Sequence, residues 1–264
     1  MDMGLEGKVV FVTGGSIGIG LAVAKAFAGE GADVIIGARQ RERVLAEASG
    51  IQDAYGVRSL GISMDVTKPD DIDAACGEID RVFGGVDVLI NNAGTGSEET
   101  IQEATDEKWN YYWDLHVMAA VRISRVLIPG MKRRGGGVIL NTASICAKQP
   151  LSYEPIYNTT KAALVMFGKC LAGEVIGDNI RVNTISPGLI QTPDWMKTAG
   201  ILAPKEGKSP QEYLDGIAEE NAPIRRFGTP EELANTYVFL ASDNAAYSVG
   251  SNYYVDGGWL RVAE

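Results

Sequence analysis

Histidine is nearly absent from this sequence, since His116 is the only one among 264 residues. A Ser/His/Asp hydrolase triad and a His-rich metal site are therefore not expected. Cysteine is scarce as well: Cys76, Cys146 and Cys170 are odd in number and widely spaced, which fits neither a disulfide framework nor a zinc motif. We expect free thiols and no metal site.

Excess positive charge and long apolar runs are also lacking. The formal net charge is −10, whereas binding to nucleic acid or to an anionic membrane needs a basic surface. No apolar run approaches the roughly 20 residues that cross a bilayer, and residues 1–7 lack the basic flank and apolar stretch of a signal peptide. These absences predict a cytoplasmic protein without nucleic-acid or membrane partners.

No feature of the sequence marks a boundary between domains. It contains no Pro/Ser-rich linker, no low-complexity tract and no run of like charge. Its 45% hydrophobic and 22% charged residues are ordinary for a globular protein. We therefore expect a single domain over residues 1–264.

Short runs of β-branched and apolar residues alternate with helical patterns, which predicts an α/β fold with a parallel sheet. We expect helices to start after Thr67, which has Asp70 three residues later, and after Thr229, which precedes Pro230. Residues 193–222 break the alternation, and we interpret them as a partly helical insertion that forms a substrate lid. The expected strands are Val9 to Val12, Val34 to Ile36, Ser59 to Ser63, Val86 to Ile90, Val138 to Asn141, Ile180 to Ile185 and Tyr253 to Val255.

A glycine-rich turn follows the first expected strand and precedes a helical pattern. Glycines there let the backbone approach a pyrophosphate, and the helix N-terminus supplies N–H donors and a positive dipole end. Glycine clusters alone mean little in a chain with 32 glycines, but the flanking strand and helix favour a dinucleotide-binding turn. Its expected cofactor-binding residues are Gly14, Ser16, Ile17, Gly18, Ile19 and Gly20.

A tyrosine and a lysine, Tyr157 and Lys161, are four residues apart in a segment that is expected to be helical, so both lie on one helix face. An ammonium group near a phenol favours the phenolate, which suits the phenol for proton exchange with a substrate oxygen. Ser144 follows the expected strand Val138 to Asn141, at the end where ligands of open α/β sheets bind. Taken singly, each residue could instead be an ordinary turn or helix residue.

Together these motifs resemble the classical short-chain dehydrogenase/reductase family, and the resemblance covers the chain from Lys8 to Trp259. The resemblance implies a single-domain Rossmann fold, a doubly wound seven-stranded parallel sheet with helices on both faces. It also implies an oxidoreductase that transfers a hydride between a nicotinamide dinucleotide and a carbonyl or alcohol substrate. The motifs that carry the resemblance are the glycine turn, Asp65, Asn91 to Gly94, Ser144 thirteen residues before Tyr157, Lys161, and Pro187 with Gly188.

The resemblance also implies a role for each matching residue. Tyr157 would be the general acid/base, Ser144 would position the substrate oxygen, and Lys161 would bind the nicotinamide ribose and lower the tyrosine pKa. Without the resemblance, the other matching residues could simply close strands or cap turns. Besides Tyr157 and Lys161, the residues implied to contact the cofactor are Asp65, Val66, Asn92, Ala93, Gly94, Pro187, Gly188, Ile190 and Thr192.

His116 is a departure from the family pattern, because it stands seven residues after Trp109, where the family usually has an asparagine. In the family, that asparagine supports a water-mediated proton path to the lysine. A histidine could take over that path as a fourth catalytic residue, or it could be a packed, hydrogen-bonded side chain.

The end of the second expected strand indicates which dinucleotide binds. A carboxylate there would bind the ribose hydroxyls and repel a 2′-phosphate, whereas an arginine would accept the phosphate. The sequence has no acid at this point and places Arg39 there. Against this, Ile17 stands where many NADP-preferring relatives carry a second basic residue. We therefore expect NADP(H) as the preferred cofactor, with NAD(H) possible as an alternative.

The substrate is expected to be a small carbonyl or alcohol compound, interconverted between ketone and secondary alcohol. A 3-oxoacyl-thioester (acyl-carrier-protein) reductase is a narrower alternative, for which Arg133 and Arg134 are the only local basic pair. A catalytically silent dinucleotide-binding regulator and a hydride-cycling epimerase or dehydratase are alternatives of other classes. By resemblance we also expect a homotetramer. The expected substrate wall comprises Gly94 to Ser97, Ile145, Cys146, Leu151 to Glu154, Leu189 and residues 193–222.

Overall fold

The computed structural model describes residues 2–151 and 154–262. Its seven strands form one parallel sheet in the order β3-β2-β1-β4-β5-β6-β7. All seven expected strands are confirmed, and the order reverses between β1 and β4, as a doubly wound sheet requires. The strands are β1 Val9–Thr13, β2 Asp33–Ala38, β3 Ser59–Ser63, β4 Val88–Asn91, β5 Gly137–Thr142, β6 Ile180–Pro187 and β7 Asn252–Val255.

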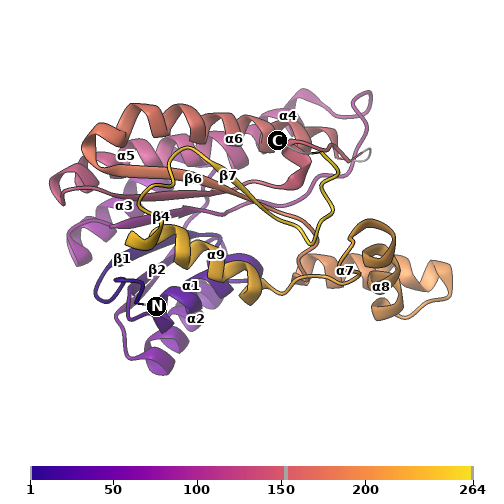
Figure 1. Ribbon diagram of the computed structural model, residues 1–264, viewed down its shortest axis with the longest axis horizontal. Coiled ribbons are helices and arrows are strands. Elements are labelled where there is room, and N and C mark those ends of the chain that lie inside the picture. Colours follow the sequence, from indigo (N-terminus) through magenta and orange to yellow (C-terminus); the bar gives the residue numbers. More distant parts are fainter. Residues whose placement is uncertain (1, 152–153, 263–264) are drawn as a thin grey trace.

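The central strands are apolar throughout because both faces of the sheet are covered. In β1, Val10 and Val12 point into one apolar core, whereas Val9 and Phe11 point into the other. Helices α1 Gly18–Gly29, α2 Arg41–Tyr55 and α9 Pro230–Ala241 pack on the first core, and α3 Pro69–Phe83, α5 Ala119–Arg133 and α6 Pro155–Val175 on the second (Figure 1). The sheet is therefore the middle layer of three.

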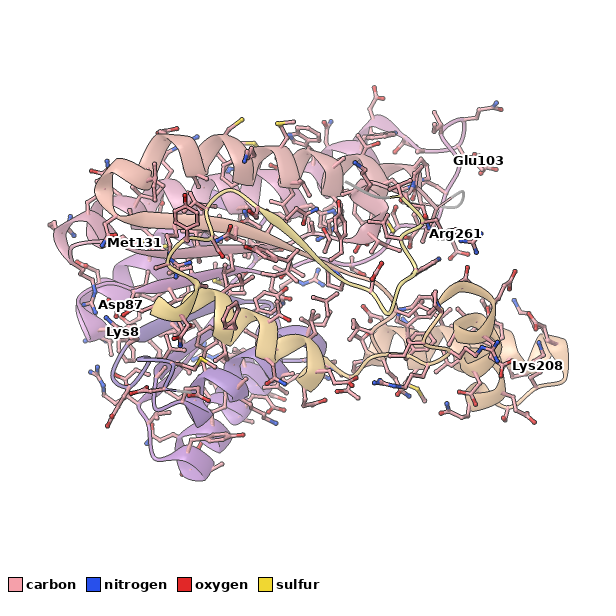
Figure 2. All side chains as sticks on the ribbon, in the orientation of Figure 1. Lys8, Asp87, Glu103, Met131, Lys208 and Arg261 are labelled. Carbon is pink, nitrogen blue, oxygen red and sulfur yellow. The ribbon has the colours of Figure 1, made fainter. Side chains whose placement is uncertain are left out.

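Two regions lie at the carboxyl ends of the strands: the connection after β4 and the 193–222 insertion. Residues 92–105 connect β4 to α4 Asp106–Trp113, and a π-helical segment, η1 Asp114–Met118, joins α4 to α5. The 193–222 insertion is helical, as expected: α7 Pro193–Leu202 and α8 Pro210–Asn221 project beside the sheet (Figure 1). Figure 2 labels Glu103 and Lys208 at this end of the molecule, and Lys8 and Asp87 at the opposite end.

The predicted helix starts have different outcomes. Thr229 caps α9 in a capping box with Glu232, as expected. The helix expected after Thr67 is confirmed, since α3 begins at Pro69, but the cap signature is wrong: Lys68 precedes α3 and no side chain caps that helix. The Thr67 hydroxyl instead donates to Oδ1 of Asp65 at 2.8 Å, since the chain turns back on Asp65 before the helix begins.

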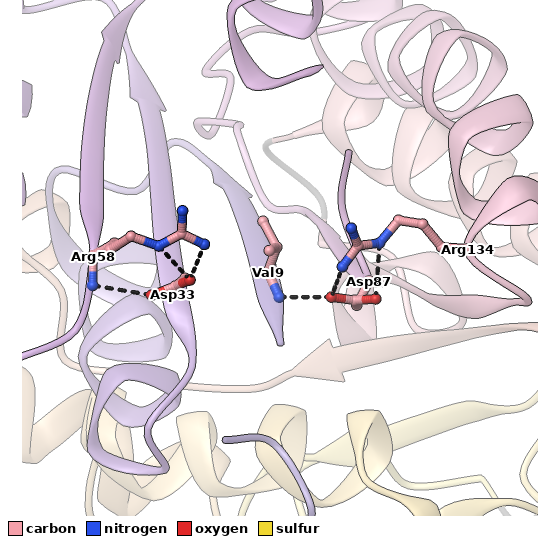
Figure 3. A network of polar contacts seen from close by, with 5 residues as sticks. All are labelled: Val9, Asp33, Arg58, Asp87 and Arg134. Atoms are coloured by element: carbon pink, nitrogen blue, oxygen red, sulfur yellow. Dashed lines mark hydrogen bonds and ion pairs between the residues drawn. The ribbon is translucent and has the colours of Figure 1, made fainter. Parts of the chain in front are cut away.

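Two aspartates form hydrogen bonds at the amino ends of the strands, at the opposite edge of the sheet from the connection after β4 and the 193–222 insertion (Figure 3). Asp87 accepts hydrogen bonds from the amide of Val9 at 2.8 Å and from Nε of Arg134 at 3.0 Å. Asp33 accepts from Nε of Arg58 at 2.8 Å. Polar groups at this end of the sheet are thus paired within the protein, which leaves the carboxyl end for ligands.

No helix within residues 2–151 or 154–262 combines the length and apolar character that a bilayer span requires.

Candidate active site

The glycine turn lies between β1 and α1 and packs against the segment that follows β4. Gly14 and Gly18 have φ values of +65° and +57°, a left-handed backbone that disfavours other residues. A Cβ on Gly20 would overlap the carbonyl oxygen of Gly14, and a Cβ on Gly14 would lie 2.9 Å from Cα of Ala93. Only glycines allow this close approach, and the resulting backbone suits a phosphate group at the N-terminus of α1.

Thr13 joins the glycine turn to the end of β4, and the sequence analysis gave it no role. Its hydroxyl accepts hydrogen bonds from the amides of Asn92 at 3.0 Å and Ala93 at 3.1 Å. In return, Nδ2 of Asn92 donates to the carbonyl of Thr13 at 3.0 Å. A threonine at the end of a buried strand is too common to signal such a role, which depends on the neighbouring strand.

Ser144, Tyr157 and Lys161 come together at the ends of β5 and α6, as expected. The Ser144 hydroxyl shares a hydrogen bond with the Tyr157 phenol and accepts another from the amide of Cys146 at 3.2 Å. Nζ of Lys161 lies 5.4 Å from the centre of the Tyr157 ring and donates to the carbonyl of Thr142 at 2.7 Å. All three catalytic candidates are buried or half-buried.

Burial is the largest influence on the pKa values of Tyr157 and Lys161. It raises the pKa of the Tyr157 phenol above its ordinary value, although the hydrogen bond with Ser144 acts in the opposite direction. Burial also lowers the pKa of Lys161 to about 8. The net shift in the pKa of Tyr157 is therefore opposite to the expected lowering, because desolvation of the phenol is the largest effect on it.

His116 lies inside the π-helical segment Asp114–Met118 and is 2% exposed. Its Nε2 accepts a hydrogen bond from the amide of Thr95 at 3.4 Å, and its Nδ1 lies 2.8 Å from the hydroxyl of Thr160. That hydroxyl donates to the carbonyl of Tyr157, so Nδ1 carries the proton. Burial and then the charge of Lys161 hold the pKa of His116 well below its ordinary value, so the ring is neutral.

The other residues that were expected to bind the cofactor lie along the same end of the sheet. Arg39 follows β2, and its Nη1 donates to the Tyr111 hydroxyl at 3.4 Å. Asp65 and Val66 follow β3; burial opposes ionisation of Asp65, but hydrogen bonds from Thr67 outweigh it and lower the pKa of Asp65. The remaining residues end β6 or follow β1, β4 or β6: Ser16, Ile17, Ile19, Asn92, Ala93, Gly94, Pro187, Gly188, Ile190 and Thr192.

The residues after β6 pack closely against neighbouring segments of the chain. A Cβ on Gly188 would lie 2.7 Å from Cα of Asp256, at the end of β7. Ile190 forms an isolated parallel bridge with Gly228. Thr192 precedes α7, and its side chain lies within 3.7 Å of where a Cβ on Gly18 would stand. The segment after β6 thus lies next to the glycine turn.

The expected substrate wall has an acidic part and an apolar part, although its residues 152–153 lie outside the described residues. A Cβ on Gly96 would lie 2.7 Å from Oε1 of Glu154. Burial, then the charges of Glu99 and Glu98, raise the pKa of Glu154 to about 7. The apolar part is a cluster around Tyr157 that includes Ile145, Cys146, Leu151, Leu189, Trp195 and Trp259.

Comparisons with known proteins agree with this arrangement. The family model described as Enoyl-(Acyl carrier protein) reductase matches residues 14–260. Among curated proteins, an uncharacterized oxidoreductase of Bacillus subtilis is 36% identical over 99% of both chains, and the 3-oxoacyl-(acyl-carrier-protein) reductase of Vibrio cholerae is 34% identical over 98% of this chain and 100% of its own.

Solved structures give a stronger likeness. The L-sorbose reductase of Gluconobacter frateurii, in complex with NADPH and L-sorbose, is 58% identical with a TM-score of 0.98 over 100% of both chains. An NADPH-bound short-chain oxidoreductase of Pseudomonas aeruginosa is 30% identical with a TM-score of 0.89, over 97% of this chain and 98% of its own. The chain therefore belongs to the classical short-chain dehydrogenase/reductase family, the oxidoreductases that interconvert ketones and secondary alcohols by hydride transfer with a nicotinamide dinucleotide.

Proposed function

We propose that this protein is an NADPH-dependent reductase of a ketose, with L-sorbose or a near relative as substrate. The observation that carries the proposal is the 58% identity to the Gluconobacter frateurii L-sorbose reductase over the whole of both chains. The 3-oxoacyl-(acyl-carrier-protein) reductases, at 34% identity, are considerably more distant.

The polar side of the cleft supports a polyhydroxylated substrate. The hydroxyl of buried Ser97 accepts a hydrogen bond from the amide of Tyr157, and half-buried Glu154 immediately precedes α6, the helix that carries Tyr157. The carboxyl group of Glu154 can pair with sugar hydroxyls, whereas an acyl chain would leave it without a partner from the substrate, at a cost of about 1–3 kcal/mol.

The alternative 3-oxoacyl-thioester reductase receives no support from the expected basic pair. Arg134 forms a 2.6 Å ion pair with Asp87 at the amino ends of the strands, and Arg133 faces Asp80 at 4.0 Å. Figure 2 places the labelled Asp87 at the end of the molecule opposite Glu103 and Lys208. These arginines are thus remote from the cleft, where an acyl carrier would have to dock.

The residues at the cleft fit a nicotinamide dinucleotide. The glycines at positions 14 and 20 let the turn pack closely on itself and on Asn92 and Ala93. The turn leads directly into α1, and the N-terminus of a helix suits a pyrophosphate. The glycine turn would hold that group, and Lys161 would hold the nicotinamide ribose. The bound dinucleotide supplies the hydride.

The chain's own residues handle the proton. The phenol of Tyr157 donates its proton to the substrate oxygen as that oxygen gains negative charge, and the Ser144 hydroxyl donates a hydrogen bond to the same oxygen. The raised pKa of Tyr157 keeps the proton in place until that moment. Both ring nitrogens of His116 are engaged by Thr95 and Thr160, which supports a holding role for His116 over a proton relay.

The preference for NADPH over NADH rests on Arg39. This arginine follows β2, where no carboxylate is present to repel a 2′-phosphate, and Tyr111 holds its guanidinium. NADPH in the structures of two relatives supports the same preference.

We propose one domain over residues 1–264, with residues 193–222 as a substrate lid, and a homotetramer in the cytoplasm. The insertion follows β6 at the carboxyl end of the sheet, and its helices α7 and α8 project there (Figure 1), which supports the lid. Sizing by light scattering tests the tetramer.

A substrate panel tests the proposed function. We would measure NADPH oxidation with L-sorbose, D-fructose, a non-sugar cyclic ketone and a 3-oxoacyl thioester. The proposal predicts that kcat/KM for L-sorbose exceeds that for the thioester by at least about 100-fold. A preference for the thioester would overturn the ketose assignment and leave the family assignment intact.

A further inference from the structure

Residues 94–99 include part of the proposed substrate wall, yet they belong to no helix or strand. A segment of this kind cannot satisfy its own backbone groups and needs partners from a neighbouring element. The partners come mainly from one face of α4 and its π-helical continuation.

Three side chains of that face hold the segment. The Tyr112 hydroxyl donates to the carbonyl of Gly96 at 2.8 Å. Nζ of Lys108 donates to the carbonyl of Glu98 at 3.3 Å and lies 2.5 Å from the carboxylate of Glu99. One turn further along, His116 accepts from the amide of Thr95. The contacts therefore run in order along the segment.

The spacing explains why these residues act together. Lys108, Tyr112 and His116 are successively four residues apart. In a regular α-helix, residues four apart drift around the axis, because a turn holds 3.6 residues. The π-helical segment Asp114–Met118 holds more residues per turn, so it reduces this drift and keeps His116 on the face of Tyr112.

The ion pair between Lys108 and Glu99 matters for the position of the segment, because the Glu99 side chain is buried from solvent. The Glu99 side chain is 5% exposed, and among the described residues its carboxylate oxygens accept no well-formed hydrogen bond. Lys108 is therefore the charge that balances a buried carboxylate. Removing the ammonium group would leave that charge uncompensated and would favour movement of the segment toward water.

The far side of the segment meets the catalytic helix. Ser97 is 4% exposed, and its hydroxyl accepts a hydrogen bond from the amide of Tyr157 at 3.3 Å. Gly96 lies against the carboxyl group of Glu154. The segment is thus clamped between α4 on one side and α6 on the other.

We propose that Lys108 and Tyr112 are positioning residues that fix residues 94–99 against α6 and so set the substrate side of the cleft. Neither side chain needs to touch the substrate. The inference rests on the proposed function for the identity of the substrate, but the positioning itself does not depend on that identity.

The test compares two variants with matched controls. Tyr112→Phe removes one hydroxyl without changing shape, and Lys108→Met removes the charge. Tyr55→Phe, at the exposed end of α2, and Lys132→Met, which breaks a remote ion pair with Asp178, are the controls. For Tyr112→Phe we expect the KM for L-sorbose to rise about three- to tenfold with a smaller change in kcat, as loss of one hydrogen bond predicts. The Kd for NADPH should change less than about twofold.

A second readout requires no substrate. In the NADPH complex, amide hydrogen exchange of residues 94–100 should accelerate in Tyr112→Phe and Lys108→Met, while exchange in the strands and in both controls stays as in the wild type. Unchanged exchange of residues 94–100 in Tyr112→Phe overturns the proposal, and so does a rise in the KM with equal loosening of the whole protein. If L-sorbose fails as a substrate but exchange accelerates locally, the positioning role stands and the proposed function fails.

Discussion

At the scale of single residues, the site combines groups whose protonation is set mainly by burial. The phenol of Tyr157 keeps its proton, Lys161 has a pKa lowered to about 8, and His116 is neutral. These protonation states suit a site that reduces a carbonyl group. Tyr157 holds the proton to be donated, and the developing negative charge on the carbonyl oxygen draws that proton from it.

Glu154 makes stability depend on pH. Its pKa in the folded protein, about 7, exceeds the ordinary value of 4.5 because of burial and the charges of Glu99 and Glu98. The folded state therefore holds this proton more tightly than the unfolded chain does. The resulting stabilisation is complete below the unfolded pKa and is lost as the pH rises through the folded pKa.

We predict that the wild type loses more thermal stability than Glu154→Gln between about pH 5 and about pH 8. Melting curves of both proteins across this range, without cofactor, measure the difference. Glu220→Gln, an exposed position near the end of α8, is a suitable control and should follow the wild type. Parallel curves for wild type and Glu154→Gln would contradict the raised pKa.

At the scale of elements, the two ends of the sheet have different roles. The amino ends carry paired charges that stabilise the strands, and the carboxyl ends carry the candidate site. Asp87 accepts from the Val9 amide and from Arg134, and its side chain is 16% exposed. Neither partner lies near the cleft.

We predict that Asp87→Ala lowers the free energy of unfolding by about 1–3 kcal/mol, because a buried amide and an arginine lose their acceptor. Urea unfolding measures the loss. Asp80→Ala, which removes an exposed partner of Arg133, should cost less than about 0.5 kcal/mol. Kinetic constants at saturating cofactor should be unchanged in both, and a loss of activity in folded Asp87→Ala would contradict the division between the two ends.

Some of these elements could be predicted from the sequence, and others could not. The strands and the glycine turn were predictable because periodicity and glycine spacing are local patterns. The role of Thr13 and the π-helical segment were not, because each depends on a neighbour distant in sequence. The cap assigned to Thr67 failed for a local reason, because Asp65, two residues earlier, accepts the hydrogen bond of its hydroxyl. Burial, which no local pattern reveals, reversed the expected shift in the pKa of Tyr157.

At the scale of the whole molecule, a pair of helices, α7 and α8, projects beside the sheet (Figure 1). These helices pack mainly on each other and on the short turn between them. Their exposed apolar residues, Met196 and Ile201, lack a covering layer in the described chain. A lid that orders over bound ligand would provide one.

We predict that amide exchange of residues 193–222 slows when NADPH and a ketose bind, and slows less with NADPH alone. Hydrogen exchange followed by mass spectrometry measures this protection. The strands β1 and β4 serve as the internal reference. Protection that is the same with and without both ligands would show that the insertion is a static wall.

The central claim is that Tyr157 protonates a ketose as NADPH delivers the hydride, and Tyr157→Phe tests it most directly. We would measure NADPH-dependent L-sorbose reduction and, separately, the Kd for NADPH in the wild type and in this variant. The account predicts a fall in kcat/KM of at least about 100-fold, with the Kd for NADPH changed less than about threefold. A variant that binds NADPH and retains wild-type kcat/KM would contradict the role of Tyr157.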